Sequence, residues 1–534
     1  MYRRGVKDAI DRAHVQLAEL VAALSLGIDL GFGQPMEHVL RQCLIAVRLA
    51  DRIGLDADAR AVVYYTALLV NVGCHSDAHE QAKWFGDDIA LKSGKYEHQL
   101  GTPRATVATM RLLGSGSPPL HRFRVGLEFV LSGHRDVDDM ITHHARMART
   151  LGEQLGLSDD VLEALAGAYE QWDGRGWPGV WRGEQVPVAA RLAQLAEYVE
   201  VAHRIGGVEA VKQLARERGG KQFDPRLAEL MHDEARTILA DLDSTPGWEA
   251  VIDVEPALAL VLSGARLDRA LEAIANFVDL KSPYFLGHSR AVAHLAAAAG
   301  EHLGLSQADL RTLRRAALVH DLGRLGISNS ILDKRGPLGA GEWERVRLQP
   351  HLTDRMLHRS AALAPLGVIA VEHRERLDGS GYPRGVSGNA ISPAARILGA
   401  ADAYQALREP RPHRPVRSAD EAAATLEAEL RAGRLDAEAV HAVLAAAGHS
   451  VAPRRHGPAG LTEREIEVLR LLARGLSNKE IARQLVISRK TVGKHVEHIY
   501  AKIDSSSRAA ASLFAVQHGL VPEADHGAAA SVTR

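Results

Sequence analysis

The stretch Ala317-Leu318-Val319-His320-Asp321-Leu322-Gly323 ends an apolar, helix-forming run with an adjacent imidazole and carboxylate, followed at once by glycine. A neighbouring His-Asp pair can offer a nitrogen and an oxygen donor to one metal ion. Further candidate ligands lie before and after the pair, at His288, His351, His373 and Asp402. Each lies within or at the end of a stretch with helical spacing of apolar residues, so the sequence predicts a metal centre formed between helices.

The composition indicates a helical protein with no overall charge bias. Of the 534 residues, 46% are hydrophobic, 25% charged and 4% aromatic, which suits roughly three or four domains. Alanine is abundant and alternating β-branched runs are scarce, so we expect an all-α fold. The 65 Lys and Arg residues balance 66 Asp and Glu residues, so bulk charge favours neither nucleic acid nor a membrane. Two cysteines, no long apolar run and no secretion signal predict a cytoplasmic protein.

The sequence contains an internal repeat. His38 and Asn71 are 33 residues apart, as are His288 and Asp321, with no gap between. Further on, the segment WDGRGWP at 172–178 echoes LDGSGYP at 377–383. The first copy is longer by 45 residues, which we place between 80 and 140, where GSGSPP at 114–119 is typical of a loop. We therefore expect two tandem copies of one helical domain, at 1–250 and 251–449.

The two copies differ at the candidate metal ligands. The corresponding residues of the first copy are Val70 for His320, Asn71 for Asp321, Ala168 for His373 and Glu197 for Asp402. Valine and alanine cannot bind a metal ion, so we expect a structural, sensory or pairing role for this copy. A helix predicted at 6–24 should pack on it. We assign no role to its remaining histidines, His75, His79, His98, His143 and His144.

Five short motifs follow one another through the second copy. They are HS at 288–289, HDLGRLGI at 320–327, EWE at 342–344 leading to His351, HRERLDGSGYP at 373–383, and ARIL at 395–398 leading to Asp402. In this order they resemble the HD superfamily of metal-dependent phosphohydrolases, specifically the HD-GYP subfamily, over residues 275–440. The resemblance implies a two-metal phosphodiesterase, most often of cyclic di-GMP, in which Asp321 bridges the ions. The ligands that it implies are His288, His320, Asp321, His351, His373 and Asp402.

Two positions depart from the family pattern. The family usually has two successive histidines where this chain has His373-Arg374, and a lysine where it has Arg324. The first change removes a ligand from the second metal, while the mononuclear set of His288, His320, Asp321 and Asp402 remains. Arginine does not coordinate metal, although the guanidinium of Arg324 can hold a phosphate.

The ligand types favour one or two divalent transition-metal ions, Fe or Mn before Zn, over Ca or Mg. Such ions promote attack on phosphorus. Asp321 and Arg324 are therefore the candidate catalytic residues. Three outcomes stay open: turnover of a phosphoester, binding of metal or nucleotide without turnover, or a relic site.

A local basic segment lies near the C-terminus. Residues 460–521 hold ten Lys and Arg against six Asp and Glu. Thr462 and Glu465 form a capping-box pattern, and two further helices, ending at Gln484 and spanning 489–503, have helix-turn-helix spacing. The motifs LTERE at 461–465, NKEIA at 478–482, SRKTV at 488–492, HV at 495–496 and GL at 519–520 resemble the LuxR-type DNA-binding domain. Candidate DNA-contacting residues are Lys479, Ser488, Arg489, Lys490, Thr491, Lys494 and His495.

The resemblance implies binding of double-stranded DNA as a homodimer, paired through a last helix at 508–518. We expect a linker at 450–460, the DNA-binding domain at 461–522 and a disordered tail at 523–534. The prediction is a cytoplasmic regulator whose metal or nucleotide state biases DNA binding, with a cyclic dinucleotide or another phosphoester as ligand. The alternative is a cyclic di-GMP phosphodiesterase that its DNA-binding tail merely localises.

Overall fold

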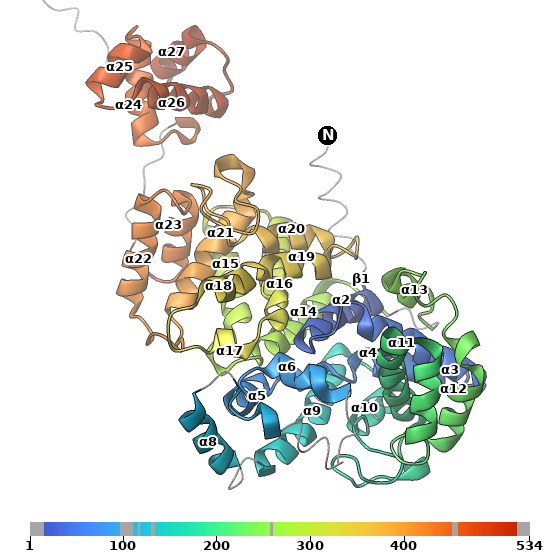
Figure 1. Ribbon diagram of the computed structural model, residues 1–534. Coiled ribbons are helices and arrows are strands. Elements are labelled where there is room, and N and C mark those ends of the chain that lie inside the picture. The colour runs from blue at the N-terminus through green and yellow to red at the C-terminus, as the bar shows by residue number, and fades with distance from the viewer. Residues whose placement is uncertain are drawn as a thin grey trace, which may run out of the picture. The chain divides into compact units, whose positions relative to one another are not determined.

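The computed structural model describes residues 15–96, 110–115, 118–129, 134–256, 260–450 and 458–520. The chain folds as two compact units, Met1–His449 and Ser450–Arg534, and both are helical (Figure 1). In these ranges the only strands are a two-residue pair, β1 (Val15–Gln16) antiparallel to β2 (Val261–Leu262). The predicted all-α fold is confirmed. None of the helices described is long and apolar enough to cross a membrane.

The helix predicted at 6–24 is only partly right. Residues 6–14 lie outside the described ranges, and Val15 and Gln16 form β1 instead of helix. Helix α2 (Leu17–Gly31) then begins, and all of its residues except Glu19 and Leu30 are buried. It packs against the first copy and against 3-10 helix η6 (Leu322–Gly326) of the second. A helix buried on every side has no polar face, so its role is to join the two copies.

The first copy carries the predicted hairpin of α3 (His38–Arg52) and α4 (Ala57–Leu69). The turn between them fits its residues, because Gly54 has φ 75° and the Asp56 side chain caps α4 by accepting from the Ala59 N–H. The elements that follow are η1 (Val72–His75), α5 (Ala78–Phe85), α6 (Asp88–Ser93), η2 (Gly94–Tyr96), α8 (Pro119–Glu128), α9 (His134–Leu155), α10 (Asp159–Ala166), η4 (Gly183–Gln185), α11 (Val188–Arg218), α12 (Pro225–Ile238) and α13 (Gly247–Asp253).

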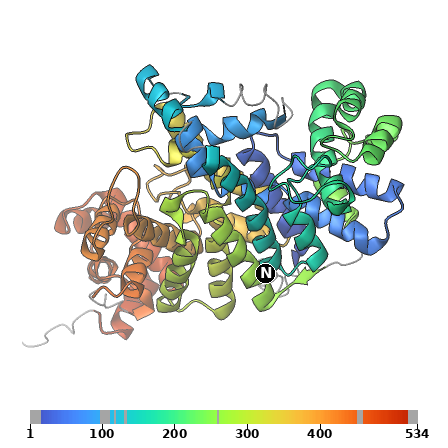
Figure 2. The same cartoon turned by 90° about the horizontal axis from the view of Figure 1, so that it is seen from below.

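The second copy repeats this order around the hairpin of α15 (His288–His302) and α16 (Gln307–Val319). Helix α15 packs on α16, α21 and α23. The two copies lie side by side in both views of the first unit (Figures 1 and 2). The remaining elements are α14 (Gly264–Asp279), η5 (Pro283–Phe285), η6, α17 (Asn329–Leu332), α18 (Ala340–Arg347), α19 (Gln349–Leu357), α20 (Ala364–Glu372), η7 (Gly388–Ala390), α21 (Pro393–Leu407), α22 (Ala419–Arg431) and α23 (Ala437–Ala446).

Matching contacts recur at equivalent places in the two copies. Glu170 accepts hydrogen bonds from the backbone N–H groups of the loop at 179–181, and Glu375 does the same for the loop at 384–386. Arg191 pairs with Asp224 as Arg396 pairs with Asp436 at 3.1 Å. The sequence repeat is therefore also a repeat of tertiary contacts. The boundary predicted at residue 250 stays a prediction.

The second unit contains η8 (Pro458–Gly460), α24 (Glu463–Ala473), α25 (Asn478–Gln484), α26 (Arg489–Lys502) and α27 (Arg508–Gln517). The predicted capping box is present: the Thr462 side chain accepts from the Glu465 N–H, and the Thr462 N–H donates to Glu465 Oε2 at 2.8 Å. Its core is formed by fully buried apolar residues that include Leu461, Leu469, Ile481, Val492 and Ile499. Most of the predicted linker, 451–457, and the predicted tail, 523–534, lie outside the described residues.

Candidate metal centre

Four elements of the second copy bring five predicted ligands together. His288 is the first residue of α15, and His320 and Asp321 follow the end of α16. His373 ends α20, and Asp402 lies inside α21. All five side chains are at most 1% exposed.

The donor atoms of these residues converge. His288 Nε2 lies 3.2 Å from Asp402 Oδ1, and His320 Nε2 lies 3.2 Å from Asp321 Oδ2. Two overlapping groups, His288–His320–Asp402 and His320–Asp321–His373, have all their donor atoms within 4.8 Å of one another. Three nitrogens and two carboxylates at this separation fit a transition-metal ion such as Fe, Mn or Zn.

Each histidine has its other ring nitrogen engaged. Nδ1 of His320 donates to the Ala317 carbonyl at 2.6 Å, and Nδ1 of His373 donates to the Ala370 carbonyl at 2.5 Å. Nδ1 of His288 lies 2.8 Å from Glu409 Oε2. These bonds fix the tautomers that leave the Nε2 lone pairs free for a metal.

Several of the converging atoms have no hydrogen bond of good geometry within the described parts of the protein. They are Nε2 of His288, His320 and His373 and Oδ1 of Asp402, whose Oδ2 instead faces Arg374. A buried polar atom without a partner is destabilising, so a cluster of them pointing at one place is typical of an ion-binding site.

The electrostatics of His320, His373 and Asp402 favour the protonation states that a metal requires, whereas at His288 burial is outweighed by Asp402 and Glu409, which raise its pKa. Burial lowers the pKa of His320 to about 3, and burial followed by the nearby Arg374 lowers that of His373 well below its usual range. Burial alone would raise the pKa of Asp402, but Arg374 and His288 outweigh it and hold that pKa well below the ordinary value. Neutral imidazole and ionised carboxylate are the forms that ligate metal.

Two arginines and an amide border the cluster. Arg324 forms a short ion pair with Asp321, and its guanidinium lies 3.8 Å from the centre of the Phe285 ring. Arg374 Nη1 lies 3.0 Å from Asp402 Oδ2, and Gln349 Nε2 donates to Asp321 Oδ1. Burial lowers the pKa of Arg324 to about 10, so it stays charged at neutral pH.

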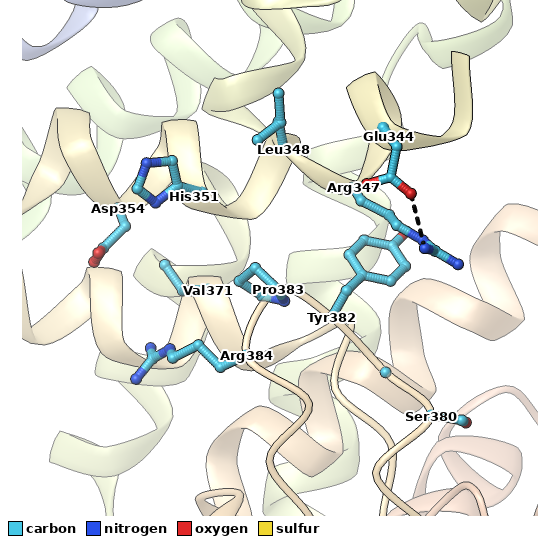
Figure 3. A pocket seen from close by; sticks show the side chains of 11 residues that line it. Glu344, Arg347, Leu348, His351, Asp354, Val371, Ser380, Tyr382, Pro383 and Arg384 are labelled. Atoms are coloured by element: carbon cyan, nitrogen blue, oxygen red, sulfur yellow. Dashed lines mark hydrogen bonds and ion pairs between the residues drawn. The ribbon is translucent and has the colours of Figure 1, made fainter. Parts of the chain in front are cut away.

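The structure does not bring His351 into this cluster. His351 is exposed and belongs to neither group of donor atoms found among the described residues. It lines an open pocket of about 560 Å³ together with residues that include Arg347, Tyr382 and Arg384 (Figure 3).

The residue of α19 that faces the cluster is Gln349, two positions before His351. Residues two apart on a helix point to different sides. The buried face of α19 runs through Gln349, Thr353, Met356 and Leu357. The helical period of this stretch places Gln349 on the buried face of α19 and His351 on the exposed face, so periodicity is the sequence signal that could have identified Gln349.

The equivalent position in the first copy is occupied by an internal cation. Lys95 Nζ lies 2.7 Å from Glu197 Oε1, the counterpart of Asp402, and Asn71, the counterpart of Asp321, donates to the same oxygen at 3.0 Å. Aromatic rings that include those of Tyr96 and Tyr169 surround the ammonium at 5.6 to 5.9 Å. The ammonium group of Lys95 therefore provides the positive charge at this position of the first copy.

Of the histidines without an assigned role, His144 is the structural counterpart of Gln349. A Cβ on Gly73 would lie 2.1 Å from the His144 carbonyl oxygen, and a Cβ on Gly323 would lie 2.0 Å from that of Gln349. Gly73 and His144 are 71 residues apart in the chain, whereas Gly323 and Gln349 are 26 residues apart. The difference of 45 residues equals the predicted extra length of the first copy. His75 is buried, His79 pairs with Asp333 at 2.9 Å, His143 is exposed, and His98 lies outside the described residues.

All seven candidate DNA-contacting residues lie on α25, on α26 or at its N-cap. Lys479, Arg489, Lys490 and Lys494 are exposed, whereas Thr491 and His495 are half-buried. Ser488 is the N-cap of α26 and accepts from the Thr491 N–H at 3.0 Å. The basic face of a second helix after a tight turn is the geometry that enters a major groove.

Comparison with known proteins identifies relatives for both units. A family model described as "HD domain" matches residues 272–439, and one described as "Bacterial regulatory proteins, luxR family" matches 459–515. The 3'3'-cGAMP-specific phosphodiesterase 3 of Vibrio cholerae serotype O1 is 33% identical over 419 residues, which are 78% of this chain and 91% of the relative. The cyclic di-GMP phosphodiesterase response regulator RpfG of Xanthomonas campestris pv. campestris is 37% identical over 183 residues, 34% of this chain and 46% of the relative.

A solved structure extends the similarity to three dimensions. The crystal structure of a cyclic GMP-AMP specific phosphodiesterase from V. cholerae matches with a TM-score of 0.57 and 29% sequence identity. The match covers 82% of this chain and 99% of the solved chain.

Proposed function

This chain belongs to the HD-GYP family of HD-domain proteins and ends in a LuxR-family DNA-binding domain, and we propose that it is a transcription regulator whose metal centre binds a cyclic dinucleotide. The relatives that it resembles over most of its length are named as phosphodiesterases of such molecules. We propose Fe or Mn as the metal, in a protein that acts as a homodimer in the cytoplasm.

One observation carries the metal-binding part of this proposal. Nε2 atoms of three buried histidines, each with its Nδ1 engaged elsewhere, face the carboxylates of Asp321 and Asp402. A divalent ion held by these residues would supply Lewis-acid stabilisation of a phosphoryl oxygen.

The residues around the centre suit an anionic ligand. Arg324 and Arg374 contact the two carboxylates, and Arg411 lies 4.7 Å from the centre of the Phe285 ring, which Arg324 also contacts. Guanidinium groups donate paired hydrogen bonds to phosphate oxygens. The Arg374 side chain is 23% exposed, so it is accessible to a ligand that enters from solvent.

The homodimer proposal rests on the second unit. Helix α27 exposes Leu513 and Val516, which are 58% and 63% accessible and lie three residues apart on one face. Such a face suits pairing with a second copy of the same helix. Light scattering of the full chain tests it.

Metal analysis of purified protein tests the centre. The wild type is expected to retain a divalent transition metal, and His320→Ala is expected to lose it. His351→Ala is the matched control, since it removes an exposed histidine of the same copy and should leave the metal content unchanged. A wild type without metal, or equal loss in both variants, would refute the proposal.

Ligand binding and turnover are measured separately. Calorimetry with 3'3'-cGAMP and with cyclic di-GMP tests binding, and chromatography of the same mixtures tests hydrolysis. DNA affinity measured with and without the bound dinucleotide tests coupling, because a ligand shifts DNA binding only if it prefers one of two conformations.

The second candidate function is a phosphodiesterase that the DNA-binding unit localises. It is favoured by the extent of the similarity to the V. cholerae phosphodiesterase. Gene expression separates the two, since only the regulator requires promoter changes in both a His320→Ala strain and a Lys494→Ala strain.

A further inference from the structure

We propose that the centre holds a single divalent ion and that the guanidinium of Arg374 takes the place of a second ion, as the positive group that holds a phosphate of the ligand. The inference rests on the proposed function and specifies the composition of its site. It is carried by the contacts of the two carboxylates and by the identity of two residues, Gln349 and Arg374.

The two carboxylate oxygens of Asp402 face different partners, the histidines and Arg374. Its Oδ1 faces His288 Nε2 at 3.2 Å and His320 Nε2 at 3.9 Å. Its Oδ2 faces Arg374 Nη1 at 3.0 Å. One oxygen is thus available to an ion among the histidines, and a fixed cation engages the other.

The two carboxylate oxygens of Asp321 also face different partners. Its Oδ2 lies 3.2 Å from His320 Nε2 and 3.6 Å from His288 Nε2, and it also pairs with Arg324. Its Oδ1 accepts the hydrogen bond from the Gln349 amide. When a carboxylate bridges two ions through both oxygens, each oxygen binds one ion; here Oδ2 faces the histidines, and Gln349 engages Oδ1 on the side where a second ion would bind.

The amide orientation of Gln349 is fixed by this contact. With no ion between the two groups, turning the amide over would place its oxygen against Asp321 Oδ1, two acceptors in contact, so the nitrogen faces the carboxylate. An amide NH₂ group donates hydrogen bonds and does not ligate metal. Gln349 therefore closes the side of Asp321 on which a second ion would lie.

The first copy shows that the fold accepts a histidine at this position. His144 occupies the place of Gln349, with its backbone against Gly73 as that of Gln349 lies against Gly323. The glutamine is thus not imposed by the backbone geometry. Replacing Gln349 by histidine is a substitution that the same backbone arrangement already accommodates.

Arg374 remains charged beside the site. A guanidinium group keeps its proton in proteins, and Arg374 Nη1 lies 3.0 Å from Asp402 Oδ2. Only part of the guanidinium is used by Asp402, because its five N–H donors exceed what one carboxylate oxygen accepts. The remaining donors and the 23% exposed side chain are available to a phosphate.

The chain replaces ions by fixed cations in both copies. In the first copy the Lys95 ammonium lies against Glu197, the counterpart of Asp402. In the second copy the Arg374 guanidinium lies against Asp402 itself. The two copies thus show complete and partial replacement of metal by side chains.

Metal stoichiometry in the full chain tests the inference. After loading with excess Mn and removal of free ion, the wild type is expected to hold one ion per chain, and the folded Gln349→His/Arg374→His double variant is expected to hold two. No ion in the wild type would refute the metal centre itself. Two ions in the wild type would refute this inference alone. A double variant that is as thermally stable as the wild type but still holds one ion would refute it as well.

The role of Arg374 is tested by ligand affinity at constant metal content. Arg374→Gln is expected to keep one ion and to weaken binding of cyclic di-GMP at least about tenfold, since a charge-assisted hydrogen bond contributes this much. Arg384→Gln is the matched control, because Arg384 is an exposed arginine on the neighbouring loop. Equal affinities for wild type and Arg374→Gln, or no wild-type binding of cyclic di-GMP or inorganic phosphate, would overturn the assignment.

Discussion

The ammonium nitrogen of Lys95 lies 2.7 Å from Oε1 of Glu197, inside the first copy and at the position that corresponds to the metal centre of the second. Tyr96 donates to the same oxygen at 2.9 Å. Burial would raise the pKa of Glu197, but Lys95 outweighs burial and lowers it, so the pair is ionised. The first copy therefore depends on an internal cation, and its stability should reflect that.

Replacing Lys95 by methionine should destabilise the first unit strongly. The substitution leaves Glu197 buried without its cation, and an uncompensated buried charge costs about 3–5 kcal/mol. Denaturant unfolding followed by circular dichroism measures this. Lys221→Met is the control, since Lys221 is exposed and its ammonium donates to the Glu217 carbonyl. A midpoint unchanged in Lys95→Met would contradict the role given to the ammonium.

Replacing Gly323 by alanine should also destabilise the protein. The added Cβ would lie 2.0 Å from the Gln349 carbonyl oxygen, so α19 must move away from η6. Overpacking of this kind costs about 1–3 kcal/mol and sometimes more. Because Gln349 contacts Asp321, metal affinity should fall as well.

Gly341 provides the control position for the Gly323→Ala substitution. A Cβ there meets nothing within 4 Å, and the residue lies in α18. Gly341→Ala should therefore stabilise the helix by about 0.5–1 kcal/mol. Thermal unfolding and metal titration of both variants check the pair, and similar behaviour of the two would show that the close approach at Gly323 is unimportant.

The stability of the protein at acid pH should depend on Asp88 of the first copy, which pairs with Lys281 of the second. It is buried against Lys92 and Lys281, with N–O distances of 3.3 and 3.2 Å. Burial alone would raise its pKa, but Lys281 and Lys92 outweigh burial and lower it. A carboxyl group with a lowered pKa contributes stability above its ordinary pKa, and that contribution is lost as the pH falls below it.

Asp88→Asn should therefore be much less stable than the wild type at neutral pH, by about 3–5 kcal/mol. The difference should stay constant down to about pH 4 and shrink at lower pH. Unfolding midpoints of both proteins between pH 3 and pH 7 measure it. A difference that grows on acidification would show that the sign of the Asp88 contribution is wrong.

DNA affinity should depend steeply on salt. Lys490 and Lys494 are exposed on α26, where their ammonium groups can pair with DNA phosphates. Removing one such lysine should reduce the slope of log affinity against log salt by about 1, because one fewer phosphate is neutralised. Fluorescence anisotropy with a duplex at several salt concentrations measures the slopes of Lys490→Ala and Lys494→Ala.

Ser488→Ala should behave differently from the lysine variants. Ser488 caps α26 through the Thr491 N–H, so removing its hydroxyl should destabilise the helix by about 1 kcal/mol. The salt slope should change less than in Lys494→Ala. Lys221→Ala, in the first copy, should alter neither quantity.

Much of the fold could be predicted from the sequence because local patterns specify it. The hairpin of α3 and α4, the capping box at Thr462 and the helices of the second unit all appear where spacing and capping residues place them. The strand at Val15–Gln16 escaped prediction, because its partner, Val261–Leu262, lies far away in the chain. A two-residue strand has no periodicity of its own.

The sequence by itself determined the repeat, the helical class, and the pairing of a His-Asp motif with a basic C-terminal segment. It also selected His288, His320, Asp321, His373 and Asp402, which the structure brings together. These follow from residue types and spacing, which act within one element or between elements in fixed order.

Only the tertiary structure decided what surrounds those residues. It turned His351 to the surface, placed Gln349 against Asp321, set Arg374 against Asp402 and brought Lys95 to Glu197, 102 residues away in the chain. The reason is physical: periodicity fixes which side chains share a face of a helix, but the packing of elements remote in sequence decides which face meets the site.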